Sequence, residues 1–178
     1  MKNTLENLNI APRLMAISMI TPLVECSDWV VDTVVDKRPF ESYVELASVL
    51  VETILTANKQ QHLELFRGHP ELAGSEALEG RMTKASNSEQ GRLGLLDLEP
   101  DDLLLLLQLN AEYRSRFGYP FIIALHRVSD LKALFFTFKR RLNGTALEEY
   151  TNTLAEIASV IEARTARAYG SEVEENRL

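Results

Sequence analysis

A histidine placed between a glycine and a proline is the first residue in this chain that could do chemistry. His69 lies in the stretch "LFRGHPELAG", where a helical pattern ends. Pro70 fixes its own φ angle and disfavours the helical conformation at the residue before it. His69 is therefore predicted on stiff, non-helical backbone, which suits an acid–base group that titrates near neutral pH. The same setting also suits an ordinary loop.

The segment "SNSEQ", from Ser86 to Gln90, admits two interpretations that can coexist. Ser-x-x-Glu is the capping box of a helix start, in which Ser86 and Glu89 would satisfy each other's backbone N–H groups. A helix start also offers N–H groups that suit an anionic ligand.

An arginine interrupts the apolar face of the last predicted helix. Apolar residues recur there at steps of three and four, and Arg164 continues the series whereas Arg167 lies off it; the series is Leu147, Tyr150, Leu154, Ile157 and Ile161. Arginine is seldom fully buried without a partner. Arg164 could extend to water near the helix end, or it could point into a pocket and bind a carboxylate. In the second case the guanidinium lacks a partner until a ligand binds, and leucine in its place would leave stability unchanged or raised.

Composition excludes several classes of function. The chain has 178 residues, with 19 basic and 26 acidic side chains and a net charge of -7. This acidic balance, without a Lys/Arg cluster, argues against nucleic-acid binding. The apolar runs are much shorter than the roughly 20 residues that span a bilayer, so we expect no membrane association and a cytoplasmic protein. The single cysteine, Cys26, excludes an internal disulfide and is interpreted as a small buried hydrophobic residue. The three histidines have no metal-binding spacing, so no metal site is predicted.

Helical periodicity runs through nearly the whole chain. The first half predicts a helix capped by Asn9 that ends near Pro22, a short helix capped by Ser27, a buried stripe from Tyr43 to Ile54, and a short helix that ends at Gly68. Residues 68–85 are predicted to form a long ordered loop, a kind of segment that is often functional.

The second half contains a stripe from Leu103 to Phe117, closed by Gly118. Asn110 interrupts this stripe and is interpreted as a buried amide that bonds to the backbone of the loop it faces, since an unpaired amide would cost about 1–3 kcal/mol. "PFIIAL" follows as a short extended segment, and then a helix capped by Ser129 and a last helix over 145–168. The predicted fold class is all-α: residues 1–178 form a single compact multi-helix domain with a long ordered active-site loop.

Four motifs, in their order and spacing, carry a resemblance to a known family. They are "GHPELAG", "SNSEQ", "LNAEYRSRFGYPFII" and "EIASVIEAR". With them the chain resembles the OHCU decarboxylases, which act on 2-oxo-4-hydroxy-4-carboxy-5-ureidoimidazoline. The resemblance implies an all-helical enzyme of urate degradation that forms (S)-allantoin without a cofactor or metal. It also implies a homodimer, as in many members.

The resemblance assigns roles residue by residue. The proton donor falls on His69, and Glu89 and Arg164 are the other catalytic residues that it implies, with the acid–base role of Glu89 left open. Substrate binding falls on Pro70, on Ser86, Asn87, Ser88, Glu89 and Gln90, and on the backbone of Phe121, Ile122, Ile123, Ala124 and Leu125. The chain departs from the commoner family pattern in "EQGRLGL" and in "Arg-Thr" after "EA".

Two other functions remain as alternatives. One is a non-enzymatic helical interaction module with a decayed site, against which the intact His69, Glu89, Gln90 and Arg164 argue. The other keeps the scaffold but acts on a different carboxylated ureide.

Overall fold

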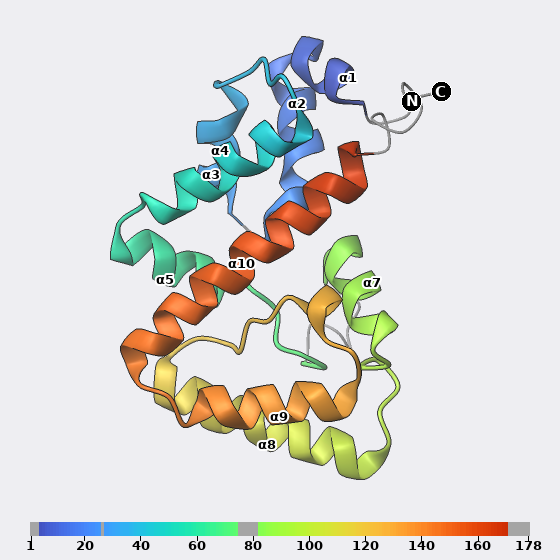
Figure 1. The fold of residues 1–178 in the computed structure, drawn as a ribbon, viewed down its shortest axis with the longest axis vertical. Coiled ribbons are helices and arrows are strands. Elements are labelled where there is room, and N and C mark those ends of the chain that lie inside the picture. Colours follow the sequence, from blue (N-terminus) through green and yellow to red (C-terminus); the bar gives the residue numbers. More distant parts are fainter. Residues whose placement is uncertain (1–3, 26, 75–81, 171–178) are drawn as a thin grey trace. The chain divides into compact units, whose positions relative to one another are not determined.

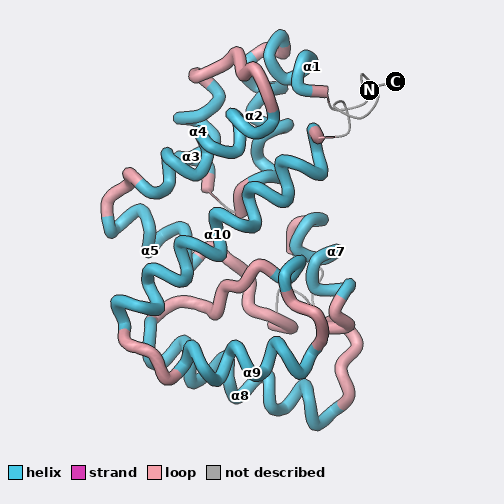
Figure 2. The backbone as a smooth tube through the Cα atoms, viewed as in Figure 1, coloured by secondary structure: helices cyan, strands magenta, loops and turns pink. Residues whose placement is uncertain are grey.

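The computed structural model describes residues 4–25, 27–74 and 82–170, and every regular element in these ranges is a helix (Figures 1 and 2). The all-α prediction is confirmed. Cys26 and residues 75–81, which form the middle of the predicted loop, lie outside the described residues. The chain divides into two compact units, one formed by residues up to His62 together with those from Ala158 on, and the other by Leu63–Ile157. A single domain stays a prediction.

The first unit is built from short helices with apolar inner faces. They are α1 (Leu5–Ile10), α2 (Arg13–Ile20), the 3-10 turn η1 (Thr21–Leu23), α3 (Asp28–Val35), α4 (Tyr43–Leu55) and the second half of α10 (Ala146–Tyr169). Helix α3 packs against both α2 and α4. The predicted stripe on α4 is confirmed, because Leu46, Leu50 and Ile54 are buried.

Of the two helix caps predicted in this unit, Asn9 is wrong and Ser27 is right in position only. Asn9 lies inside α1, and its amide bonds to both the N–H and the carbonyl of Phe40. The helix that Asn9 was predicted to cap is α2. It begins after Pro12, whose fixed φ suits a helix start. Ser27 occupies the N-cap position of α3, as predicted, but its hydroxyl donates to the Glu25 carbonyl and makes no cap hydrogen bond to the helix.

The second unit carries the segments that the sequence singled out. It contains the end of α5 (Lys59–Arg67), α7 (Lys84–Arg92), α8 (Pro100–Phe117), the 3-10 turn η2 (Leu125–Arg127), α9 (Leu131–Leu142) and the first half of α10. Its core is aromatic: the rings of Phe121 and Phe138 stack with centroids 3.8 Å apart, and Tyr113 meets both edge-on. Gly118, with φ 81°, ends α8 as predicted.

Helix starts in this unit differ from the predictions by a few residues. Thr83, not Ser86, caps α7 by accepting from the Ser86 N–H, so the predicted capping box is wrong and Ser86 lies inside the helix. Asp130, not Ser129, caps α9. A capping box does occur at the start of α10, where Thr145 and Glu148 bond to each other's backbone N–H groups. In the first two cases a neighbouring residue with an equally good acceptor displaced the expected one.

Pro120 to Ala124 run without regular secondary structure into η2, which agrees with the short extended segment that was predicted. In Figure 2 this stretch is the loop that crosses between the end of α8 and the start of α9. No helix within the described ranges is long and apolar enough to cross a bilayer.

Candidate active site

His69 is tied to the end of the helix that precedes it. Helix α5 ends at Arg67, and the Nδ1 atom of His69 lies 2.8 Å from the carbonyl oxygen of Leu65. A carbonyl can only accept, so Nδ1 carries the proton in this contact. The contact orients the ring and makes Nε2 the nitrogen that acid–base chemistry would use.

Polar side chains hold the loop that follows Pro70. The amide oxygen of Gln90 accepts from the Ala73 N–H at 2.9 Å, and its amide nitrogen donates to the Glu71 carbonyl at 3.3 Å. The amide nitrogen of Asn110 donates to the Leu72 carbonyl at 2.9 Å. Both amides are buried. The predicted role of Asn110, holding the loop it faces, is confirmed.

One residue of this loop has strained backbone. Ala73 has a φ of 48°, in the left-handed region that costs a non-glycine residue about 1–2 kcal/mol. Its N–H is the group that Gln90 binds. The side-chain amide therefore holds the backbone in a conformation that alanine would otherwise seldom adopt.

The five residues of "SNSEQ" lie on helix α7 and differ in their exposure to solvent. Ser86 and Gln90, one turn apart, are buried, whereas Asn87 and Ser88 are exposed and Glu89 is intermediate. Gln90 is engaged with the loop after His69, so the structure gives it a structural contact in addition to its predicted part in substrate binding. The roles of the five residues toward a ligand stay predictions.

Arg92, which ends α7, was not predicted as a site residue. Its guanidinium donates to the carbonyls of Leu125 and, at 3.0 Å, of Val128. It thereby links α7 to η2, which also pack together. Arg92 is part of "EQGRLGL", so this departure from the commoner family pattern creates a contact to the end of the predicted binding segment.

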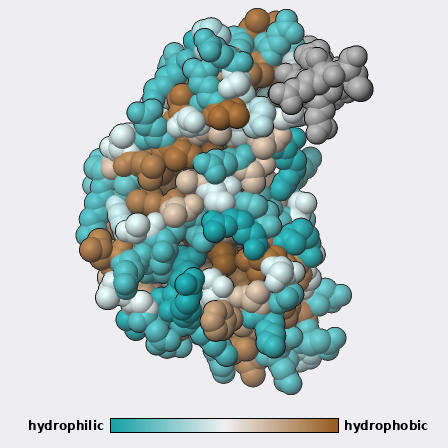
Figure 3. Space-filling view, in the orientation of Figure 1, coloured by the Kyte–Doolittle hydropathy of each residue, from teal (hydrophilic) through white to brown (hydrophobic). Residues whose placement is uncertain are grey.

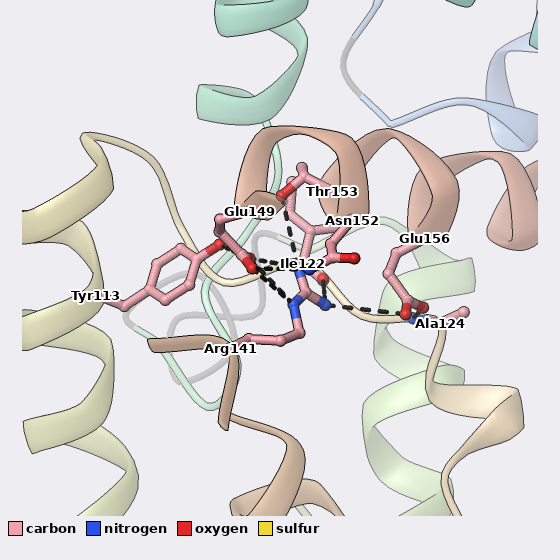
Figure 4. Close-up of polar contacts among 8 residues, drawn as sticks. All are labelled: Tyr113, Ile122, Ala124, Arg141, Glu149, Asn152, Thr153 and Glu156. Carbon is pink, nitrogen blue, oxygen red and sulfur yellow. Dashed lines mark hydrogen bonds and ion pairs between the residues drawn. The ribbon is translucent and has the colours of Figure 1, made fainter. Parts of the chain in front are cut away.

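The backbone of Phe121 to Leu125 is held by side chains of α9 and α10 (Figure 4). The Ile122 carbonyl accepts from Arg141 at 2.8 Å, and the Ala124 N–H donates to the Glu156 carboxylate at 2.8 Å. The resemblance to the family implies that the backbone of this segment binds substrate. The structure shows that the Ala124 N–H already has a protein partner.

A buried ion pair supports Arg141. Its Nη2 lies 2.5 Å from the Glu149 carboxylate, and both side chains are at most 3% exposed. The hydroxyl of Tyr113 donates to the same carboxylate, and the guanidinium lies 4.5 Å from the centroid of the Phe121 ring. Burial, and then the neighbouring carboxylate, raise the pKa of Tyr113.

Arg164 lies in the other compact unit. It is 6% exposed, so of the two alternatives that the sequence left open its side chain points inward and does not extend to water, and its Nη1 lies 2.8 Å from the Glu25 carboxylate, which is also buried. The expectation that the guanidinium has no partner before a ligand binds is therefore wrong. Glu25 lies 139 residues away in sequence, and no pattern around it predicts the pairing.

No group of three or more His, Cys, Asp or Glu side chains among the described residues is arranged to hold a metal ion. The other two histidines also differ from His69 in setting: His62 is buried, with Nε2 2.6 Å from the Ile54 carbonyl, and His126 is exposed.

The fold and these residues define an all-helical protein with a histidine on a loop held by buried amides. The model of the family described as OHCU decarboxylase matches residues 9–166. The chain belongs to the OHCU decarboxylase family.

Relatives of known name cover most of the chain. The 2-oxo-4-hydroxy-4-carboxy-5-ureidoimidazoline decarboxylase of Mus musculus is 33% identical over 150 residues, 84% of this chain and 80% of the mouse protein. The protein of the same name from Haloferax volcanii is 31% identical over 169 residues, 95% of this chain and 98% of the relative.

Two solved structures share the fold. A crystal structure of (S)-allantoin synthase superposes with a TM-score of 0.73 at 21% identity, covering 93% of this chain and 53% of that one. A crystal structure of OHCU decarboxylase in the presence of (S)-allantoin superposes with a TM-score of 0.69 at 17% identity, covering 86% of this chain and 98% of that one.

Proposed function

We propose that this protein decarboxylates 2-oxo-4-hydroxy-4-carboxy-5-ureidoimidazoline to (S)-allantoin in urate degradation. Family membership and the names of the relatives support this activity. The observation that carries it is His69, whose ring is oriented by the Leu65 carbonyl and whose following loop is held by Gln90 and Asn110.

The substrate supplies its own electron sink. Its carboxylate is on C4, next to the C5=N1 double bond of the ring, so the electron pair left after loss of CO2 forms a C4=C5 double bond while the electrons of C5=N1 move onto N1. The reaction therefore calls for no cofactor or metal. The protein has to hold the substrate and deliver one proton to one face of C5, while the proton of the C4 hydroxyl passes to N1 and C4 becomes the second carbonyl of allantoin.

His69 delivers that proton. Because Nδ1 donates to the Leu65 carbonyl, the transferred proton leaves from Nε2. A histidine is suited to this step because its pKa ordinarily lies near the working pH. Glu89, which is half-buried on α7, either orients and charges the imidazole or polarises the departing carboxylate, and a Glu89→Gln variant separates a carboxylate role from a purely structural one.

The other predicted residues hold the substrate. Arg164 pairs with an anionic group of the substrate, since its guanidinium carries five N–H donors and can bind Glu25 and a second carboxylate. The backbone of Phe121 to Leu125 binds ring and ureido groups, and Ser86, Gln90 and Pro70 complete the contacts.

We also propose a cytoplasmic homodimer. Apolar side chains reach the surface in several places (Figure 3). In the second unit they include Leu104 and Leu107 on α8 and Phe136 on α9, which is 70% exposed, and a cavity of about 560 Å³ lies between these helices. Of the apolar side chains of this region, Leu105, Phe135 and Phe136 line the cavity together, and apolar side chains gathered at the surface favour a protein–protein contact. Sedimentation at micromolar concentration measures the assembly state.

The activity is tested with freshly generated substrate while optical activity is recorded. We expect product to form faster than in buffer and as the S enantiomer. His69→Ala should lower turnover by about 10²–10⁴-fold, the usual contribution of a general acid, while the exposed His126→Ala control retains it.

Other outcomes separate the alternatives. Racemic product formed no faster than in buffer would exclude the enzyme and favour a helical interaction module. Turnover of related carboxylated ureides in preference to this substrate would change the substrate but keep the reaction. Activity of His69→Ala within about tenfold of the wild type would exclude His69 as the donor.

A further inference from the structure

The two peptide groups on either side of Ile123 are held from one side by charged side chains. Arg141 on α9 donates to the Ile122 carbonyl, and Glu156 on α10 accepts from the Ala124 N–H, each at 2.8 Å. The two charged groups are neighbours, because Nη1 of Arg141 lies 3.9 Å from the Glu156 carboxylate. Figure 4 shows both contacts meeting the same short stretch of backbone.

This arrangement determines where the polar groups of Ile123 point. Both peptide bonds are trans, since the one cis bond in the described ranges is Arg38–Pro39. In a trans peptide the N–H and C=O point in opposite directions. The Ile122 carbonyl and the Ala124 N–H point toward the side chains, so the N–H and the carbonyl of Ile123 point away from them.

The backbone N–H and carbonyl of Ile123 have no hydrogen-bond partner among the residues that the structure describes. No hydrogen bond from them reaches its N–H or its carbonyl, although the residue is buried. Buried backbone groups are almost always paired with protein, water or ligand. The segment therefore presents a donor and an acceptor from one residue, both on the face opposite to Arg141 and Glu156.

We propose that Glu156 and the Arg141–Glu149 pair are positioning residues, which orient the backbone of Ile123 for the substrate. The inference rests on the proposed function, in which the segment Phe121 to Leu125 binds substrate. Neither Glu156 nor Arg141 needs to touch the substrate, because each acts through the peptide group that it holds.

The support for Arg141 is built to be stiff. Glu149 takes two of its nitrogens, at 3.0 and 2.5 Å, and Tyr113 donates to Glu149 in turn. The guanidinium also lies against the ring of Phe121, the first residue of the segment. A side chain fixed on all of these sides cannot follow the Ile122 carbonyl if the backbone turns, so it resists that turn.

Glu156 offers the sharper test because its removal disturbs the core little. Its side chain is 19% exposed and lines a cavity of about 230 Å³. Water can therefore replace the carboxylate at the Ala124 N–H without leaving a buried charge unpaired. Glu156→Gln keeps an oxygen acceptor, whereas Glu156→Ala removes it. Glu162→Ala, at an exposed position on the same helix, is the matched control.

The experiment measures kcat and KM for decarboxylation, the melting temperature, and hydrogen exchange at the Ala124 amide. In Glu156→Ala we expect KM to rise about tenfold, the size of one lost hydrogen bond. We also expect kcat within about threefold of the wild type, an unchanged melting temperature and faster exchange at Ala124. Glu156→Gln and Glu162→Ala should behave as the wild type.

A double variant tests the Arg141 half of the inference. Arg141→Met combined with Glu149→Leu removes the pair without leaving a lone buried charge, so the fold should survive. We expect KM to rise by at least as much as in Glu156→Ala, with the melting temperature within a few degrees of the wild type. A KM equal to that of the wild type in both Glu156→Ala and the double variant would overturn the inference.

Failure of the inference and failure of the proposed function give different results. If the wild type does not turn over the substrate, the proposed function falls and the inference falls with it. If the wild type is active but Glu156→Ala loses melting temperature and kcat together with no change in KM, the residue is structural only, and the positioning role alone is excluded.

Discussion

The protein contains two buried arginine–glutamate pairs, one in each compact unit, and they are built differently. Arg164 meets Glu25 at 2.8 Å in the first unit, and Arg141 meets Glu149 at 2.5 Å in the second. All four side chains are nearly inaccessible to water. A pair of this kind is not by itself evidence of stability, because desolvation offsets much of the attraction.

The difference lies in what else each arginine holds. Arg141 also binds the Ile122 carbonyl and lies against an aromatic ring, and its partner is only eight residues away, across the turn at Asn143. The partner of Arg164 comes from the other end of the sequence. Burial alone therefore does not make an arginine a ligand-binding residue. Its partners decide whether it orients backbone, as Arg141 does, or could serve a substrate, as we propose for Arg164.

The largest effect is expected from leaving one charge alone. Arg164→Leu leaves the Glu25 carboxylate buried without the guanidinium, and Arg141→Leu does the same to Glu149. Each change should lower the free energy of unfolding by about 3–5 kcal/mol. Denaturant titration measures both. This reverses the expectation from sequence, in which Arg164→Leu is neutral or stabilising.

The control for this prediction is the apolar double replacement. Arg164→Leu with Glu25→Leu, and Arg141→Leu with Glu149→Leu, should each recover most of the lost stability because no buried charge remains unpaired. If Arg164→Leu alone were as stable as the wild type, Glu25 would not depend on it, and the two pairs would not be comparable.

The second prediction separates binding from stability at Arg164. In the Glu25→Leu background, Arg164→Leu should still lower kcat/KM, because the substrate loses its charged partner. The expected loss corresponds to about 2–5 kcal/mol of transition-state stabilisation. Arg164→Lys, in the same background, should recover part of it, since a point charge lacks two-point contact. Steady-state kinetics measures both.

Arg167→Leu is the matched control on the same helix, where position 167 is exposed, and it should leave kcat/KM nearly unchanged. Equal losses at positions 164 and 167 would mean that the end of α10 matters generally, and the proposed role of Arg164 would be wrong.

How far the sequence predicts this molecule depends on the range of the interaction. Helical stripes, the end of α5 before His69 and the Gly118 end of α8 follow from local patterns and are confirmed. The cap predicted at Ser86 is three residues late and the cap predicted at Ser129 is one residue early, because Thr83 and Asp130 compete for the same role. Local propensity cannot rank such neighbours.

The candidate site shows the same limit. The apolar stripe of α10 placed Arg164 on the inner face of the helix, and the same signal was present for Arg141, which continues the stripe of Leu134 and Phe138 on α9. It could have been found. The partners could not, because Glu25, Glu149 and the Ile122 carbonyl are brought to these arginines by tertiary packing, which leaves no spacing rule in the sequence.

The third prediction compares a neutral side chain, Gln90, with the charged pairs as a support for backbone. Gln90→Ala removes the acceptor of the Ala73 N–H, in a loop where Ala73 is strained. We expect a loss of about 1–3 kcal/mol in the free energy of unfolding, the cost of an unsatisfied buried group. That is less than for a broken ion pair. Ala73→Gly in the Gln90→Ala background should recover part of it, because glycine adopts the left-handed conformation without strain.

In these variants we expect kcat to depend on how firmly the backbone after His69 is held. Gln90→Ala should lower kcat because the backbone after His69 is no longer held, and Ala73→Gly alone should leave kcat close to that of the wild type. A Gln90→Ala protein with unchanged stability and kcat would show that the loop is held by other contacts.

The smallest effect concerns alkaline pH, where one buried tyrosine from each unit, Tyr113 and Tyr169, can be compared. Tyr113 belongs to the Arg141–Glu149 cluster, and burial, with the nearby Glu149 carboxylate, raises its pKa. Tyr169, whose hydroxyl donates to the Met19 carbonyl at 3.2 Å, has its pKa raised by burial to about 12. Above about pH 10 a tyrosine in the unfolded chain releases its proton while both of these keep theirs. Stability that is complete below pH 10 is therefore lost as the pH rises.

We expect the free energy of unfolding to fall above pH 10, by at most about 1.4 kcal/mol per pH unit for each tyrosine. Tyr169→Phe should remove a part of the fall that is confined to pH 10–12, because the folded protein also loses that proton near pH 12. Tyr113→Phe should remove a part that continues above pH 12, because ionisation there would place a second negative charge beside Glu149.

Denaturant titrations at several pH values give the slopes, and slopes are compared because each variant also loses a hydrogen bond at neutral pH. Parallel curves for Tyr113→Phe and the wild type would mean that Tyr113 ionises as freely in the folded protein as in the unfolded chain, and the Arg141–Glu149 cluster would then be open to water at this tyrosine.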